Sequence, residues 1–163
     1  MKAVANSSVV IALSTIRKLE LLPQRFAEGV LIPQAVWREV VETGKGQPGA
    51  VEVGSVSWFT VCEVKDKELV SLLRAELDEG EAEAIALCRE RQAKVILLDE
   101  KDARRVARRL GLAVLGTVGV LIWARRAGLV VNLREQLNTL QTQGKFRLSR
   151  SVYEEALRAV GEI

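Results

Sequence analysis

The sequence predicts an α/β fold, a single three-layer α/β/α domain over residues 1–163 in which helices cover both faces of a central parallel sheet of about five strands. Apolar runs of strand length alternate with amphipathic stretches of helix length, which is typical of strand–helix–strand units. The 163 residues suit one domain, and 48% hydrophobic residues suffice for its core. The longest apolar stretch, Leu112 to Ala124, is too short to span a membrane.

The first strand–helix unit runs from the N-terminus to a proline. Ala3 to Ala5 is predicted to be a short buried strand, and the polar residues 6–8 form a cap-type sequence that opens a helix from Val9 to about Leu22. Pro23 is expected to end that helix, because proline disrupts a helix interior.

The second unit repeats this order. Val30 to Ile32 is the second predicted strand, and Pro33 stands in the first turn of an amphipathic helix over Ala35 to Glu42. The stretch from Gly44 to Gly49 is rich in glycine and proline, so we expect a mobile loop there.

The remaining elements complete the sheet and its helical cover. Apolar runs predict three more strands: Trp58 to Val64, Val95 to Leu98 and Ala113 to Leu115. Apolar periodicity predicts six more helices: Lys67 to Leu77, Gly80 to Gln92, Asp102 to Leu110, Val118 to Ala127, roughly Leu133 to Leu140, and Ser151 to Val160.

Composition excludes several kinds of site. The chain contains no histidine, which excludes imidazole ligands, Ser-His-Asp triads and histidine general bases. Cys62 and Cys88 lack metal-ligand spacing, so we expect reduced, buried thiols. Met1 and Lys2 precede only a brief apolar run, so we expect no secretion signal, a cytoplasmic location and no membrane partner. Because the chain has no histidine, any chemistry must depend on carboxylates and metal.

Charge is unevenly distributed, although the formal net charge is only +3. Residues 76–83 hold five acidic side chains and no basic one, whereas residues 101–109 hold five basic side chains. These two stretches are candidates for one site that uses both signs of charge.

Polar residues follow several predicted strands at their carboxyl ends. Asn6 follows the first strand, Glu39 lies on the helix after the second, and Asp99 follows the strand that ends at Leu98. An open parallel sheet binds ligands beyond these ends, near the point where the strand order reverses. Glu81 opens a helix rich in small residues that can pack close to the sheet, so we expect its carboxylate in the same crevice.

Such a cluster of carboxylates indicates a bound cation. Crowded carboxylates repel one another unless a hard cation neutralises them, and oxygen ligands suit Mg²⁺ or Mn²⁺. One or two such ions can orient a phosphodiester and activate water without any histidine.

Five segments, in order along the chain, resemble a known family. They are ANSSVVIAL at 5–13, LIPQAVWREVV at 31–41, DEGEAEAIALC at 78–88, VILLDEKDARRVARRLGL at 95–112 and LGTVGVLIWARRAGL at 115–129. Together they resemble the PIN domains, metal-dependent ribonucleases that include many bacterial and archaeal toxin nucleases. The GEAEAIAL and LLDxxxAR blocks are most similar to a PIN branch known mainly from sequence.

The resemblance implies a set of metal ligands: Asn6, Glu39, Glu81 and Asp99, with Asp102 as a fifth. It implies catalytic roles for Glu39, Glu81 and Asp99. PIN proteins usually place aspartate at the position of Asn6, and asparagine offers a neutral carbonyl oxygen instead of a full negative charge. We therefore expect weaker metal affinity, and with it lower activity, than an aspartate at this position would give.

The same side chains have alternative structural interpretations. Asn6 has the character of a helix N-cap, and Glu39 fits a solvated helix face. Asp78 and Glu81 have the spacing of a capping box, in which case Glu83 is the substitute ligand.

The helix after Asp99 carries arginines opposite its apolar side. A solvated basic face is one interpretation; the other is that Arg104 and Arg108 bind the phosphates of RNA that flank the scissile one. Asp102, at the start of this helix, has an alternative role as its cap.

The leading functional hypothesis is an endoribonuclease dependent on Mg²⁺ or Mn²⁺. The resemblance further implies RNA as partner and a toxin role restrained by an antitoxin protein. We also expect a homodimer. The main alternative is a PIN-like module that binds RNA or a protein but does not cut, because Asn6 weakens the metal site. A receiver-type signalling domain fits less well, because the first strand is followed by no pair of acids.

Overall fold

The computed structural model describes residues 1–163 and contains one five-stranded, all-parallel sheet. Its strands are β1 (Ala3–Ala5), β2 (Val30–Pro33), β3 (Phe59–Cys62), β4 (Val95–Leu97) and β5 (Val114–Leu115). They lie in the order β3-β2-β1-β4-β5. The chain runs outward from β1 through β2 to β3 and then crosses back to β4 on the other side of β1, so the strand order reverses between β1 and β4. The predicted α/β class and five-stranded parallel sheet are confirmed.

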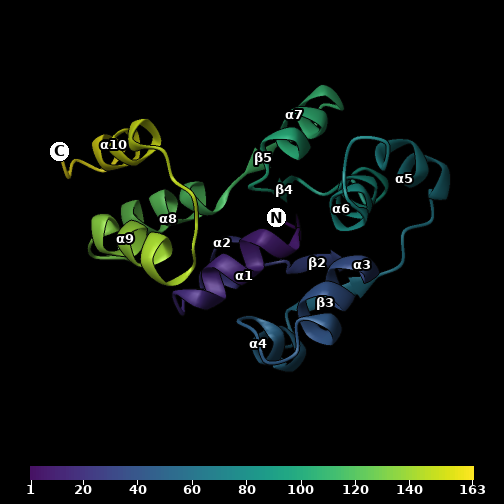
Figure 1. The fold of residues 1–163 in the computed structure, drawn as a ribbon, viewed down its shortest axis with the longest axis horizontal. Helices are drawn as coiled ribbons and strands as arrows, with labels where there is room; N and C mark the ends of the chain where they lie inside the picture. The colour runs from purple at the N-terminus through teal and green to yellow at the C-terminus, as the bar shows by residue number, and fades with distance from the viewer.

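Helices cover both faces of this sheet. They are α1 (Ser7–Thr15), α2 (Leu21–Arg25), α3 (Gln34–Trp37), the π-helix η1 (Arg38–Thr43), α4 (Ala50–Ser55), α5 (Lys67–Leu73), α6 (Glu79–Glu90), α7 (Lys101–Arg109), α8 (Thr117–Arg126), α9 (Leu133–Gln143) and α10 (Arg150–Ala159). Helices α8, α9 and α10 gather at one side of Figure 1 and α5 and α6 at the other, with α1 between them.

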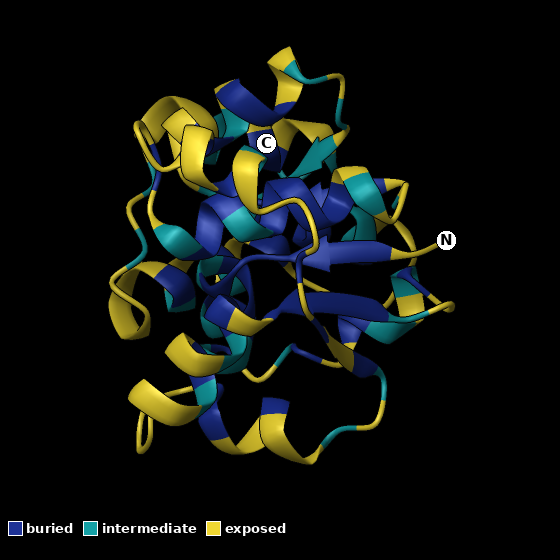
Figure 2. Cartoon of the chain, turned by 90° about the vertical axis from the view of Figure 1, so that its right-hand side faces the viewer, coloured by how far each residue is buried: buried dark blue, intermediate teal, exposed yellow.

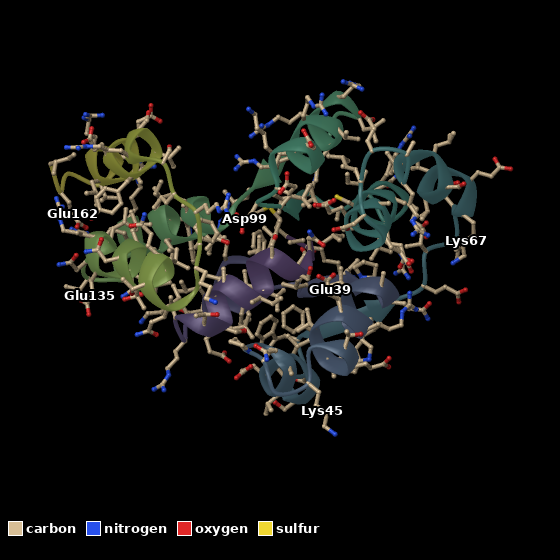
Figure 3. All side chains as sticks on the ribbon, viewed as in Figure 1. Glu39, Lys45, Lys67, Asp99, Glu135 and Glu162 are labelled. Carbon is tan, nitrogen blue, oxygen red and sulfur yellow. The ribbon has the colours of Figure 1, made fainter.

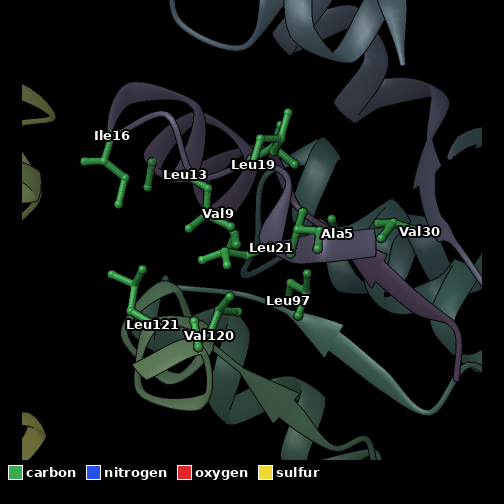
Figure 4. Packing of buried hydrophobic residues seen from close by; sticks show 14 of the residues in the cluster. Ala5, Val9, Leu13, Ile16, Leu19, Leu21, Val30, Leu97, Val120 and Leu121 are labelled. Carbon is green, nitrogen blue, oxygen red and sulfur yellow. The ribbon is translucent and has the colours of Figure 1, made fainter. Parts of the chain in front are cut away.

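Alternate strand residues face two separate hydrophobic cores, as the period of two in a strand requires. Ala3, Ala5 and Leu97 pack with α1, α2, α8, α9 and α10, whereas Val4 and Ile96 pack with α5, α6 and α7. Figure 2 shows the strands buried in the middle, and Figure 4 shows the first core between α1, β1, β4 and α8. The sheet is therefore buried on both faces.

The first predicted helix is divided in two. Arg17 has a φ of 58°, and α1 ends at Thr15 before α2 begins at Leu21. Pro23 lies inside α2 instead of ending a helix, contrary to the expectation. It is the third residue of α2, where backbone N–H groups have no partner within the helix, so the missing donor costs little.

The predicted helix from Ala35 to Glu42 also differs in detail. It begins as α3 and continues as a π-helix, which places Glu39 in the wider turn. The loop at 44–49 is present, and it leads into the short helix α4, which periodicity did not indicate.

Two further observations concern the chain as a whole. Cys62 and Cys88 are free and buried, as expected, and burial raises the pKa of the Cys88 thiol to about 11. No helix has the length and apolar character needed to cross a membrane.

Candidate active site

A cavity of about 450 Å³ lies at the carboxyl edge of the sheet, where the strand order reverses. The Asn6 N–H donates to the Leu97 carbonyl at 3.1 Å, which ties the end of β1 to the end of β4 beneath this cavity. Five carboxylates line it, together with Asn6 and a single basic side chain, Arg147; the carboxylates are Glu39, Asp78, Glu81, Asp99 and Glu100. The cavity is therefore strongly acidic.

The Asn6 side chain is buried in this wall with an unpaired oxygen. Asn6 is only 4% exposed, and its Oδ1 has no hydrogen-bond partner. Its backbone stands at the N-cap of α1, but its side chain makes no capping hydrogen bond. The hydroxyl of Ser8, which also lines the cavity, is buried and unpaired too. Buried acceptors without a donor are costly, so this wall is suited to a positively charged ligand.

Three oxygens from three elements converge next to Gly80. A Cβ placed on Gly80 would lie 3.2 Å from Glu39 Oε2, 3.4 Å from Asn6 Oδ1 and 3.6 Å from Asp78 Oδ1. Because glycine has no Cβ, this space stays open between the oxygens. The arrangement supplies the hard oxygen donors that Mg²⁺ and Mn²⁺ prefer.

Glu39 reaches the cavity from the π-helical turn. The predicted α-helical face is replaced there by η1, and such turns are frequent at functional sites. Glu39 is exposed and forms no ion pair, so its carboxylate is free to turn toward a ligand. In Figure 3, Glu39 and Asp99 lie near the middle of the view, whereas Lys67 and Glu162 lie at its edges.

Glu81 takes part in the capping box that was the alternative interpretation. Its Oε1 accepts from the Asp78 N–H at 3.1 Å, while Asp78 Oδ1 accepts from the Glu81 N–H at 2.7 Å. Burial raises the pKa of Glu81, and repulsion from nearby carboxylates adds to this. Glu83 does not replace Glu81 as a cavity residue. It lies outside the cavity lining, and its Oε1 accepts from the Ala35 N–H at 3.1 Å.

Asp99 is held by the first residue of α8. Its two oxygens accept from the Thr117 N–H at 2.7 Å and from the Thr117 hydroxyl at 2.6 Å. Burial raises the pKa of the Asp99 carboxyl and outweighs the lowering effects of Thr117 and of the positive charge on Arg104. A Cβ on Gly116 would lie 2.9 Å from Asp99 Oδ1, so only glycine fits there without a shift. The carboxylate is therefore fixed in one orientation.

The structure does not bring Asp102 into the cavity. Asp102 is exposed and lies 3.4 Å from the Arg105 guanidinium, because the first turn of α7 points it toward solvent. Arg104, in contrast, is half-buried next to Asp99, and Arg108 is exposed one turn farther along α7.

The acids share one cavity, but they do not form a tight cluster. No three acidic or cysteine side chains lie close enough together to hold a metal ion by themselves. The Asp99 carboxylate accepts a hydrogen bond from the Thr117 hydroxyl, and the Glu81 carboxylate accepts one from the Asp78 N–H. The oxygens that do converge, beside Gly80, are the unpaired Oδ1 of Asn6 and one carboxylate oxygen each from Glu39 and Asp78, so a hard cation there would be bound by Asn6 together with the acids.

Comparison with known protein families matches residues 2–162 to the PIN domain. The chain belongs to the PIN domain family. PIN domains are generally nucleases and typically bind metal ions. A search among curated proteins found no match to the chain. Family membership is therefore shown for nearly the whole length of this PIN domain.

Sequence reasoning gave no ligand role to Asp78 and Glu100, which line this PIN-domain site, and it missed three further residues. Thr117 follows the end of β5, so the rule about strand ends that selected Asp99 could have selected it as well. Phe146 and Arg147 lie in the connection between α9 and α10 and line the cavity. No periodicity or motif marks them, and only the path of the chain brings them there.

Proposed function

We propose that this PIN domain is an endoribonuclease dependent on Mg²⁺ or Mn²⁺. The observation that carries the proposal is the buried, unpaired Oδ1 of Asn6, which lies beside the Glu39 and Asp78 oxygens at the edge where the strand order reverses. Such an acceptor among carboxylates is suited to a cation. Membership of a family of nucleases supports RNA cleavage as the use of that cation.

Asn6, Glu39, Glu81 and Asp99 would hold the cation, with Asp78 as an additional donor. The bound ion supplies Lewis-acid stabilisation of the phosphodiester and activation of water for hydrolysis. Thr117 orients the Asp99 carboxylate through two hydrogen bonds, and the positive end of the α8 dipole favours its charge. Asn6 contributes an oxygen without charge, so the site has one negative charge fewer than an aspartate there would give.

Arg104 and Arg108 extend the proposed site toward the RNA backbone. They lie one turn apart on α7, and neither forms an ion pair within the chain. A flanking phosphate can therefore bind Arg108 without displacing an internal partner, whereas at Arg104 it would share the guanidinium with the nearby Asp99 carboxylate. By analogy with toxin nucleases of the family, we extend the proposal to a toxin whose activity an antitoxin protein restrains.

The test is cleavage of single-stranded RNA with millimolar Mn²⁺ and, in parallel, with EDTA. We expect cleavage by the parent protein only with metal, and its loss in Asp99→Asn. Asp102→Asn is the matched control, because it makes the same change on an exposed residue outside the cavity. Equal cleavage by the two variants, or cleavage in EDTA, would contradict the proposal.

A second candidate function is a PIN domain that binds RNA without cutting it. Two observations favour it: the neutral Asn6 in place of an acid, and an Asp99 whose two oxygens are both occupied by Thr117. This candidate predicts metal-independent RNA binding by the parent protein and no cleavage at any concentration of Mg²⁺ or Mn²⁺.

A further inference from the structure

A second cavity, of about 570 Å³, adjoins the acidic one on the side of β5 and α8. The two cavities share three lining residues, Asp99, Phe146 and Arg147. The connection between α9 and α10, which carries Phe146 and Arg147, runs in front of α1 in Figure 1. The volume is in the range of cavities that bind small organic groups. Of its lining residues, the proposed chemistry uses only Asp99 and Arg104.

The second cavity has the opposite charge. Lys101, Arg104 and Arg147 line it, against Asp99 as the single acid. None of these three basic side chains forms an ion pair, and Arg104 Nε is buried without a hydrogen-bond partner. Unpaired cations around a cavity attract an anion, and phosphate is an anion that arginine binds well.

The rest of the wall is apolar. Six hydrophobic side chains line it: Val114, Leu115, Val118, Phe146, Leu148 and Val152. Phe146 is half-buried and packs against the first core, which fixes its position at the boundary of the two cavities. Val152 is 43% exposed at the rim. An aromatic ring, an apolar wall and nearby free cations together match a nucleotide, which has one flat apolar part and one anionic part.

We propose that this second cavity binds one nucleotide of single-stranded RNA, the neighbour of the phosphate held in the acidic cavity. The base lies against Phe146 and the apolar wall, and its phosphate lies among Lys101, Arg104 and Arg147. The assignment to a strand that is being cut rests on the proposed function. Binding itself needs no metal, because the protein supplies the positive charge.

The first test measures binding of fluorescein-labelled hexauridine by fluorescence anisotropy, with EDTA present throughout. Val152→Glu adds a negative charge at the rim, and we expect it to weaken binding about tenfold. Val131→Glu is the matched control, because Val131 is 88% exposed and lies outside both cavities. Both variants change the net charge equally and substitute exposed residues, so both are expected to fold. Equal affinities of the two variants would overturn the proposal.

The second test addresses the base. Hexauridines with one abasic nucleotide at successive positions should bind the parent protein about tenfold more weakly at one position, since stacking of a base on an aromatic side chain contributes on that scale. In Phe146→Leu, which keeps an apolar side chain against the core, the same abasic change should have little further effect. If the abasic nucleotide weakens binding as much in Phe146→Leu as in the parent protein, the base does not contact Phe146.

These measurements separate the subsite from the nuclease proposal. Binding in EDTA that responds to Val152→Glu and Phe146→Leu supports the subsite even if no cleavage is found with Mn²⁺. Metal-dependent cleavage that neither variant alters refutes the subsite and leaves the nuclease proposal intact. Absence of any binding in EDTA would overturn the nucleotide assignment.

Discussion

Replacing Asn6 by aspartate changes the charge of the acidic cavity with little change in shape, and its effect can be worked out from the structure. The Asn6 side chain makes no capping hydrogen bond, so Asn6→Asp loses none. Its Oδ1 lies within about 7 Å of Glu39 Oε2, since both flank the same position beside Gly80. At that distance two charges repel by about 2 kcal/mol at an effective dielectric constant near 20, and by about 0.6 kcal/mol in water.

Glu39 and Asp78 are exposed, so solvent screens most of this repulsion. We therefore expect Asn6→Asp to lose about 1 kcal/mol of stability in EDTA, or about 2–4 °C in melting temperature. With saturating Mn²⁺ the sign reverses, because each tenfold gain in metal affinity adds about 1.4 kcal/mol. Thermal unfolding in EDTA and in millimolar Mn²⁺ measures both effects. Asn138→Asp, which adds the same charge on an exposed helix residue, is the control.

The expected pattern is a lower melting temperature than the parent in EDTA and a larger increase with Mn²⁺, accompanied by faster RNA cleavage. Identical responses of Asn6→Asp and Asn138→Asp would show that the oxygen at position 6 does not face a cation, and the reasoning from the unpaired Oδ1 would be wrong.

Three other predictions concern neighbouring features of the molecule. Thr117→Val removes the hydroxyl that orients Asp99, and should cost about 1 kcal/mol in urea denaturation and slow RNA cleavage. Arg104→Ala combined with Arg108→Ala should reduce the slope of log RNA affinity against log salt by about 1, because fewer counterions are released. Glu162→Gln should cost about 1 kcal/mol at pH 7. Burial favours a higher pKa for Glu162, but hydrogen bonds from the start of α9 and from a guanidinium outweigh it and hold that pKa below its usual value. The stability it confers is therefore present above the usual glutamate range and is lost as pH falls through the lowered pKa.

Each of these predictions has a control or a contradicting result. Unchanged cleavage by Thr117→Val would show that Asp99 needs no orientation. Arg109→Ala, an exposed change on the same helix, should leave the salt slope nearly unchanged. Glu155→Gln, also exposed, should be neutral at every pH. A cost for Glu162→Gln that is as large at pH 3 as at pH 7 would contradict the assigned pKa shift.

Most of the sheet could be predicted from the sequence, because its central strands are short, purely apolar runs with polar residues at both ends. The break between α1 and α2 could not be predicted in this way. Leu19, Leu21 and Leu22 continue the apolar pattern and pack in the same core as α1, so periodicity extends through the turn. Arg17 adopts a positive φ that no glycine or asparagine marks. The expectation that Pro23 ends a helix was wrong because proline is tolerated in the first turn of a helix as well as after its last turn.

The candidate site was predictable where it depends on strand ends. Asn6, Glu39, Glu81 and Asp99 all line one cavity, as their positions predicted. Their roles as ligands remain predictions. The capping box of Glu81 could be foreseen as an alternative but not decided, because cap and ligand use the same spacing. Arg147 could not be foreseen, since it reaches the cavity from a connection between two helices distant in sequence.

Diffraction from crystals soaked in Mn²⁺ would show whether the acidic cavity holds a divalent cation. We expect an anomalous peak beside Asn6 Oδ1, within about 2.5 Å of at least two carboxylate oxygens from Glu39, Asp78, Glu81 and Asp99. No peak in this cavity at millimolar Mn²⁺, or a peak elsewhere that leaves Asn6 Oδ1 without a partner, would contradict it.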